Sequence, residues 1–210
     1  MADLFNEKAQ TWDADDRVRQ LSSAIGASIL QHVRLDAQMT VMDFGAGTGL
    51  ISAHVAPLVK KIVAVDVSEA MLDKLAAKPE FHGKIQVLCQ NIIEQSLDEQ
   101  FDLIMSAMAM HHVQDTDKML AQFSAHLKPG AQIALADLDE EDGSFHPEGT
   151  EGVYHAGFER NAFKACMEKH GFEDVRFVTA HTVSGDEKDF PVFLALALKG
   201  PGAARHTPSL

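Results

Sequence analysis

The chain is poor in several kinds of residue that would mark a specialised class of protein. Its 210 residues include two cysteines, one tryptophan and one tyrosine, and 18 Lys and Arg against 31 Asp and Glu give a net charge of −13. Two cysteines, Cys89 and Cys166, are too few for a disulfide scaffold and lack metal-type spacing, so no metal site is expected. Because basic residues are fewer than acidic ones, nucleic acid and anionic membranes are not expected as partners.

Two further absences concern location. No apolar run approaches the ~20 residues that a membrane span requires. Residues 1–8 lack the basic start and apolar core of a signal peptide. We therefore expect a cytoplasmic protein without a membrane span, in which Cys89 lies on a buried strand and Cys166 on the apolar face of a helix.

The remaining composition, 46% apolar and 23% charged, is that of a globular protein with one sizeable core. Apolar periodicity alternates between helix-like and strand-like segments as far as residue 137 and ends with two strands. This alternation predicts an α/β fold with a largely parallel sheet and helices on both faces. The expected strands are 39–43, 60–66, 85–89, 101–106, 132–137, 173–180 and 190–198. The clearest expected helices are 15–33, 48–58, one capped by Ser68, and one starting near 159.

A glycine-rich turn follows the first expected strand. Gly45, Gly47 and Gly49 alternate with other residues, and Asp43 stands two positions before the first glycine. Glycines allow positive φ and let the backbone approach a ligand, and the N–H groups of a following helix favour an anionic group. A dinucleotide fingerprint would put its third small residue at Leu50, which disfavours an NAD-dependent oxidoreductase.

Polar residues end several other expected strands. Asp66, Asn91 and Ser106 lie at or just after strand ends, as Asp43 does. In an open α/β sheet, ligands bind at the carboxyl ends of the strands. Asp66 is suited to accept hydrogen bonds from two ribose hydroxyls, and Asn91 to contact an adenine edge between Val67 and Ile92.

These features together resemble the class I S-adenosylmethionine-dependent methyltransferases. The motif Asp43-x-Gly45-x-Gly47-x-Gly49 is similar to the first motif of that family, and similarity continues through 101–104, 111–113 and 127–131. The aromatic arm 5–13 is similar to those of the small-molecule branch, which includes ubiquinone- and menaquinone-type methyltransferases. The resemblance implies a Rossmann-like three-layer α/β/α sandwich with a seven-stranded, mostly parallel sheet, whose last strand is antiparallel and inserted between strands five and six.

The resemblance also implies the domain plan and the cofactor site. We expect a single domain over 1–199, with a helical arm (1–35), a lid-like insertion (138–158) and a disordered tail (200–210). The expected cofactor is S-adenosylmethionine, and no metal is expected at the site. Its expected contacts are Trp12, Asp43, Gly45, Ala46, Gly47, Asp66, Val67, Met71, Asn91, Ile92, Ser106 and His111.

The reaction implied is direct in-line displacement of the methyl group onto a small organic acceptor. An oxygen or nitrogen acceptor benefits from a general base, and His111, His112 and His155 are the candidates. We expect Tyr154 and His155 to point inward from the lid. The chain lacks the Asn/Asp-Pro-Pro-aromatic motif of amino-methylating nucleic-acid enzymes, reading Ser106-Ala107-Met108-Ala109, and the three thiols of arsenite-type enzymes.

Alternatives remain open at this stage. A non-catalytic S-adenosylmethionine-binding protein would keep the glycines and Asp66 but lack an acceptor pocket. A protein methyltransferase would have an open groove in place of a lid over 138–158. The acceptor, the methylated atom and the oligomeric state are not predicted.

Overall fold

The computed structural model of the chain describes residues 5–201. They form a seven-stranded sheet in the order β3-β2-β1-β4-β5-β7-β6. The strands are β1 (Thr40–Phe44), β2 (Lys61–Asp66), β3 (Ile85–Cys89), β4 (Phe101–Ala107), β5 (Leu127–Leu138), β6 (Phe172–Ser184) and β7 (Asp189–Lys199). The first five strands pair in parallel, whereas β7 is antiparallel to both β5 and β6. The expected position of an antiparallel last strand between strands five and six is confirmed.

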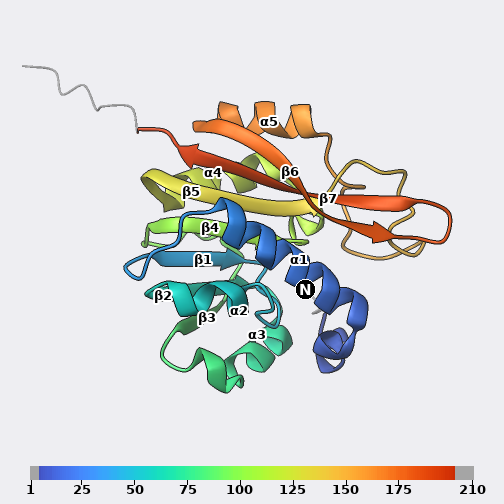
Figure 1. Cartoon of the computed structure of the whole chain (residues 1–210), viewed down its shortest axis with the longest axis horizontal. Helices are drawn as coiled ribbons and strands as arrows, with labels where there is room; N and C mark the ends of the chain where they lie inside the picture. The colour runs from blue at the N-terminus through green and yellow to red at the C-terminus, as the bar shows by residue number, and fades with distance from the viewer. Residues whose placement is uncertain (1–4, 202–210) are drawn as a thin grey trace, which may run out of the picture.

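Helices cover both faces of this sheet (Figure 1). The α-helices are α1 (Asp16–His32), α2 (Ser52–Val55), α3 (Glu69–Ala76), α4 (Thr116–His126) and α5 (Arg160–Lys169). One apolar cluster joins α1, α2 and α3 to one face, and a second joins α4 and α5 to the other. The expected three-layer Rossmann-like sandwich is therefore confirmed. Among residues 5–201, no helix combines the length and apolarity needed to cross a membrane.

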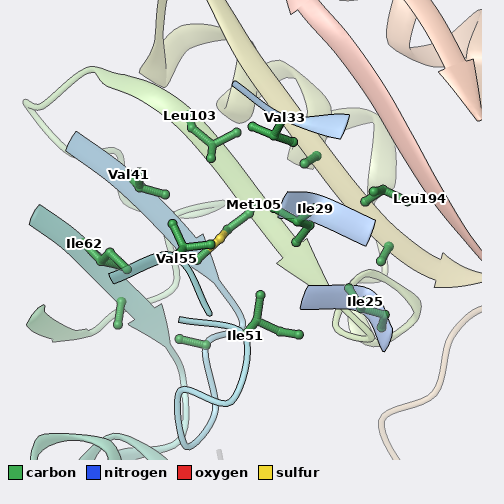
Figure 2. Packing of buried hydrophobic residues seen from close by; sticks show 14 of the residues in the cluster. Ile25, Ile29, Val33, Val41, Ile51, Val55, Ile62, Leu103, Met105 and Leu194 are labelled. Atoms are coloured by element: carbon green, nitrogen blue, oxygen red, sulfur yellow. The ribbon is translucent and has the colours of Figure 1, made fainter. Parts of the chain in front are cut away.

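Helix α1 shows how local sequence produces this packing. The Asp15 carboxylate caps its start by accepting hydrogen bonds from the N–H groups of Arg17 and Val18. Ile25 and Ile29 are one helical turn apart, so both face the sheet, where they are 1% and 0% exposed. Figure 2 shows these two side chains over the strands, in the same cluster as Val41, Leu103 and Leu194.

Three segments differ from expectation. The helix expected over 48–58 is only one turn long, because Gly49 has φ +83° before it and the chain continues after it as the 3-10 helix η3 (Ala56–Leu58), which contains Pro57. Cys89 is exposed rather than buried, because β3 is an edge strand. Strand β5 begins at Leu127 rather than near 132, because Leu127 pairs with Phe101 across a register shift.

Two connecting segments lie at one end of the sheet. The arm forms the 3-10 helices η1 (Lys8–Gln10) and η2 (Trp12–Ala14), and the chain between β5 and α5 has only a bridge between Asp139 and Phe158. In Figure 1 this β5–α5 loop (ochre) and the N-terminal arm (dark blue) lie toward the end to which the β5 arrow points. Most of the tail expected to be disordered, residues 202–210, lies outside the described residues.

Candidate functional site

The glycine turn after β1 leaves a small area of backbone uncovered. Gly45, Gly47 and Gly49 have φ values of +68°, +52° and +83°, where other residues are strained. A Cβ on Gly45 would lie 2.3 Å from the Ala109 Cβ, and one on Gly49 would lie 2.9 Å from Leu75, but one on Gly47 would meet nothing within 4 Å. Gly47 therefore faces open space, whereas its two neighbours are glycine because other chain segments pack against them.

Two carboxylates flank this turn in different environments. Asp66, at the end of β2, accepts hydrogen bonds from the Gly47 N–H (2.8 Å) and the Ser68 N–H (2.9 Å). Asp43, at the end of β1, is only 1% exposed and accepts a hydrogen bond from the Ser52 hydroxyl at 2.6 Å. Burial raises the pKa of Asp43 to about 7, opposed by the Ser52 hydrogen bond and reinforced by the charge of Asp66. Asp43 thus lies behind the turn, and Asp66 beside its open part.

The other expected cofactor contacts divide into accessible and packed residues. Val67 is 64% exposed next to Asp66, whereas Met71 and Ile92 are 2% and 0% exposed, and Ile92 belongs to the apolar cluster of α4 and α5. Asn91 is half-buried, and its side-chain oxygen accepts a hydrogen bond from the Ile93 N–H. Ala46 is buried within the turn.

Ser106 on β4 is fully buried, and its Oγ has no hydrogen-bond partner among the described residues. It lies opposite Phe44, the residue before Gly45, in the β1–β4 register. An unpaired buried hydroxyl is costly.

The turn after β4 presents two histidines to the same edge. Met108 within this turn has φ +56°, a strained value for a non-glycine residue. The His111 side chain is buried, and its Nδ1 lies 2.7 Å from Asp137 Oδ1 at the end of β5. Asp137 Oδ2 also accepts hydrogen bonds from the N–H groups of Met110 and His111. The carboxylate therefore holds both the backbone of the turn and the His111 ring.

The β5–α5 loop brings a further histidine to this turn. The rings of His111 and His112 are 4.1 Å apart, and the His146 ring from the loop lies 5.1 Å from His111 and 6.0 Å from His112. His112 Nδ1 is 2.7 Å from the Gly152 carbonyl oxygen. Burial, together with the charge of His111, lowers the pKa of His112 to about 4, although the hydrogen bond to the Gly152 carbonyl opposes this shift. Burial and His111 also lower the pKa of His146.

His155, the third expected base, is not part of this group of rings. Its Nε2 lies 2.9 Å from the Val113 carbonyl oxygen, and its ring packs 5.3 Å from Phe158. The expectation that Tyr154 points inward is wrong, because this residue is 54% exposed. Instead, the backbone N–H groups of Tyr154 and His155 both donate to the His111 carbonyl oxygen, at 2.9 and 3.3 Å. This part of the loop is therefore attached to the histidine turn by its backbone and by the His155 side chain, whereas the Tyr154 side chain is exposed.

Comparisons with known proteins find similarity to methyltransferases. A protein-family model described as a methyltransferase domain matches residues 41–130. The chain is 35% identical over 135 residues to an uncharacterised methyltransferase of Schizosaccharomyces pombe, covering 57% of this chain and 48% of that protein. It is 30% identical over 111 residues to a ubiquinone biosynthesis O-methyltransferase of Nitrobacter winogradskyi, covering 52% and 42%. The chain spans about half the length of these two relatives.

A solved structure with the same fold is phosphoethanolamine N-methyltransferase 2 of Haemonchus contortus in complex with S-adenosyl-L-methionine. Its TM-score is 0.71 at 15% identity, covering 94% of this chain and 60% of that chain. Residues 41–130 are thus similar to methyltransferase domains, and the chain shares the fold of a structure that binds S-adenosyl-L-methionine.

Four features of the edge fit S-adenosyl-L-methionine, the ligand in the Haemonchus contortus structure. The backbone at Gly47 faces open space, the Asp66 carboxylate lies beside it, and Val67 offers an exposed apolar surface. On β4, which pairs with β1, the buried Ser106 Oγ has no hydrogen-bond partner among the described residues. The residues present therefore suit a ligand that has hydroxyls, a flat apolar ring and a polar chain.

The N-terminal arm reaches the same edge. Asp13 accepts a hydrogen bond from the Thr48 hydroxyl in the glycine turn and forms an ion pair with Lys78 at 2.7 Å. Trp12, an expected cofactor contact, packs edge-on against Phe5 with ring centroids 6.2 Å apart, and Phe5 lies 5.3 Å from His112. The arm is thus fixed to the glycine turn at one point and touches the histidine turn at another.

Sequence reasoning missed two residues of this site. Asp137 was treated only as the end of a strand, although the rule that singled out Asp43 and Asp66 applies equally to it. His146 carried no local signal, because the loop that positions it has no periodic pattern. A separate group, Asp117, Cys166 and His170, has ligand-type atoms within 4.8 Å of one another. We assign no metal there, because Lys169 Nζ already pairs with Asp117 at 2.6 Å.

Proposed function

We propose that this protein transfers a methyl group from S-adenosylmethionine to a small organic acceptor, with His111 as general base. The observation that carries this proposal is the buried His111–Asp137 pair, which lies on the turn that packs against Gly45 of the cofactor-binding motif. A base oriented by a buried carboxylate next to a cofactor site is the arrangement that proton removal from an acceptor requires.

The cofactor contacts follow from the accessible polar groups. Asp66 is suited to the ribose hydroxyls, Val67 and Asn91 to the adenine ring, and Gly47 and Ser106 to the amino-acid part. S-adenosylmethionine, when bound, supplies an activated methyl group that leaves its sulfur as the acceptor atom bonds to carbon. The remaining work of the protein is to orient the acceptor, to exclude water and to take up the proton.

His111 suits the role of base better than His112 or His155. Its Nδ1 faces the Asp137 carboxylate, so Nδ1 carries the proton and Nε2 has the lone pair. Asp137 also stabilises the positive charge that His111 gains when it accepts a proton. His112 has a pKa near 4, which makes it a weak base at neutral pH, and the Nε2 of His155 is engaged by the Val113 carbonyl.

The β5–α5 loop supports a small acceptor rather than a protein. It is attached to the histidine turn through the Gly152 carbonyl and the N–H groups of Tyr154 and His155, so it acts as a lid. Two similar proteins have names that indicate small-molecule acceptors, a ubiquinone biosynthesis O-methyltransferase and a phosphoethanolamine N-methyltransferase, although another is a malonyl-[acyl-carrier protein] O-methyltransferase. A cytoplasmic location remains our proposal from the cysteine content.

The experiment that tests this function is the change in melting temperature on adding S-adenosylmethionine or S-adenosylhomocysteine, with Asp66→Ala as the comparison variant. A ligand that binds only the folded state adds ~2.7 kcal/mol at a hundred times its dissociation constant. We expect stabilisation of the native protein that is reduced in Asp66→Ala. Absence of stabilisation by either ligand, in a folded sample, would contradict the proposal. Turnover of the bound cofactor with cell metabolites then separates an enzyme from a binding protein.

A further inference from the structure

A cleft lies at the edge of the sheet opposite to the candidate site. It has a volume of about 760 Å³ and is formed where α1 ends and where β1, β4 and β5 begin. In Figure 1 this is the end of the sheet from which the β5 arrow starts. Strand β4 crosses the sheet with seven residues at ~3.3 Å each, so the cleft lies roughly 20 Å from the histidine turn. A ligand in this cleft would therefore be separate from the site of methyl transfer.

The walls of the cleft are joined by side chains from distant parts of the chain. The Gln132 amide on β5 pairs with the backbone of Arg34, 98 residues away: its Oε1 accepts from the Arg34 N–H at 3.0 Å, and its Nε2 donates to the Arg34 carbonyl at 2.7 Å. The Asp102 carboxylate on β4 accepts from the Thr40 N–H at 2.9 Å and from Lys128 Nζ at 2.7 Å. These bonds fix the segment after α1 against three strands, so the cleft is preformed.

One positive charge in the cleft is not compensated. Three charged side chains line it, and two of these, Lys128 and Asp102, pair with each other. The third, the Arg34 guanidinium, makes no hydrogen bond or ion pair with any other residue of the range 5–201. The chain as a whole has a net charge of −13 with histidine counted as neutral. Its other carboxylates act weakly here, because the Debye length is ~8 Å at physiological ionic strength. The cleft therefore favours a ligand with a single negative charge.

Apolar surface lies beside this charge. Leu198 near the end of β7 is 40% exposed, and Met39 and Pro129 line the cleft with it. Gly130, at the start of β5, borders open space, because a Cβ there would meet nothing within 4 Å. Covering exposed apolar side chains stabilises a complex, and ligand sites of roughly 300–1,000 Å³ combine such surface with a few polar groups. The ligand should therefore carry an apolar body next to its charged group.

We propose that this cleft binds a small organic carboxylate. The planar Arg34 guanidinium can pair with a planar carboxylate through two parallel hydrogen bonds. The Lys128 ammonium has three N–H donors, of which Asp102 uses one, so it can also donate to the ligand. The apolar body of the ligand covers Leu198 and Met39. This binding site is additional to the proposed methyl transfer and does not depend on it.

The test uses cinnamate, a carboxylate with an apolar body, and follows its binding to the full chain by the NMR signals of methionine and leucine methyl groups. We expect the methyl signals of Met39 and Leu198 to shift, and that of Met110 at the histidine turn to stay unchanged. Cinnamyl alcohol, the uncharged counterpart, should bind at least about tenfold more weakly, because it lacks the charge that Arg34 pairs with.

Three variants test the assignment of the charges. Arg34→Gln should weaken cinnamate binding about tenfold. Arg17→Gln, the same change at an exposed arginine at the other end of α1, should stay within about twofold of native. Asp102→Asn removes the carboxylate of the cleft but keeps an oxygen for the Thr40 N–H, and it should tighten binding about threefold. Damage to the fold would weaken binding, so a gain in affinity reports the charge itself.

Each outcome decides the inference. No cinnamate binding, or shifts confined to the histidine turn, overturns the site. Equal affinity in native protein and Arg34→Gln overturns the role of Arg34, and cinnamyl alcohol binding as tightly as cinnamate overturns the preference for an anion. Tighter binding of cinnamyl phosphate than of cinnamate overturns the assignment of a carboxylate. Calorimetric titration with S-adenosylhomocysteine keeps these results apart from the proposed function, because its affinity should be unchanged in all three variants.

Discussion

The carboxyl edge of the sheet has two halves that are built in different ways. The half at β1 and β2 presents backbone and carboxylates: Gly47 donates to Asp66, nineteen residues along the chain. The half at β4 and β5 presents imidazoles held by contacts over longer separations, 26 residues for His111 and Asp137 and 40 for His112 and Gly152. Under the proposed function, the first half binds the cofactor and the second half binds the acceptor.

Because the two halves are built differently, substitutions in them should have different effects on ligand binding and on stability. In the first half a single glycine decides whether a ligand fits, with little consequence for the rest of the fold. In the second half one carboxylate holds several segments, so that removing it affects stability as well as chemistry. The halves also carry groups with opposite pKa shifts, Asp43 and His112, so their stability should depend on pH in opposite directions.

The largest effect is expected from Asp137→Ala. This carboxylate accepts hydrogen bonds from the N–H groups of Met110, His111 and Leu138 and from the His111 ring, all at a fully buried position. Removing it leaves buried donors unpaired, and we expect a loss of about 3–5 kcal/mol of unfolding free energy, measured by urea denaturation. Asp98→Ala, at an exposed carboxylate, is the control. A loss below about 1 kcal/mol would show that Asp137 does not hold the second half together.

Gly45→Ala and Gly47→Ala sharpen the comparison within the first half. At Gly45 a methyl group would strain a positive φ and collide with the Ala109 Cβ, so we expect a loss of about 2–4 kcal/mol. At Gly47 only the strain applies, about 1–2 kcal/mol, but the methyl would occupy the open space assigned to the cofactor. Gly47→Ala should be more stable than Gly45→Ala. Calorimetry should nevertheless show that Gly47→Ala binds S-adenosylhomocysteine more weakly than native protein does. Native affinity in that variant would mean that the cofactor does not approach Gly47.

Asp43→Asn tests the pH dependence of the first half. The folded-state pKa of Asp43, about 7, lies above its unfolded value, so the folded state holds a proton that the unfolded state releases. Native stability should therefore fall as pH rises from about 4 to about 7, by at most about 1.4 kcal/mol per pH unit from this group. Urea denaturation at pH 5, 6, 7 and 8 should show a flatter profile in Asp43→Asn. Parallel profiles would mean that Asp43 is ionised throughout.

His112→Gln tests the second half with the smallest expected effect. The folded-state pKa of His112, about 4, lies below the ordinary 6.5, so its contribution is fully present above pH 6.5 and is lost as pH falls toward 4. Glutamine cannot titrate, so between pH 7 and pH 5 the variant should lose about 2 kcal/mol less unfolding free energy than native protein loses. His82→Gln should leave the native acid dependence unchanged. A His112→Gln profile identical to native would place the titration elsewhere.

The order of strands could be expected from the sequence only with help from the family resemblance. Apolar runs placed β1, β2 and β4 to within a residue or two, because a strand buried on both faces is recognisable locally. The burial of Cys89 was expected wrongly, because nothing in the segment 85–89 says that β3 is an edge strand. The start of β5 at Leu127 was missed for a similar reason, since it depends on pairing with Phe101.

The candidate site likewise contains residues that the sequence predicts and contacts that only the tertiary structure reveals. Gly45, Gly47, Asp43 and Asp66 were recognisable in the sequence, because their roles follow from backbone conformation and from their place at a strand end. The contact of His111 with Asp137, the approach of His146 and the cover provided by Phe5 were decided only by the tertiary structure. A glycine's φ is set by its own chain segment, whereas a buried imidazole acquires its partner and its pKa from segments that folding brings together.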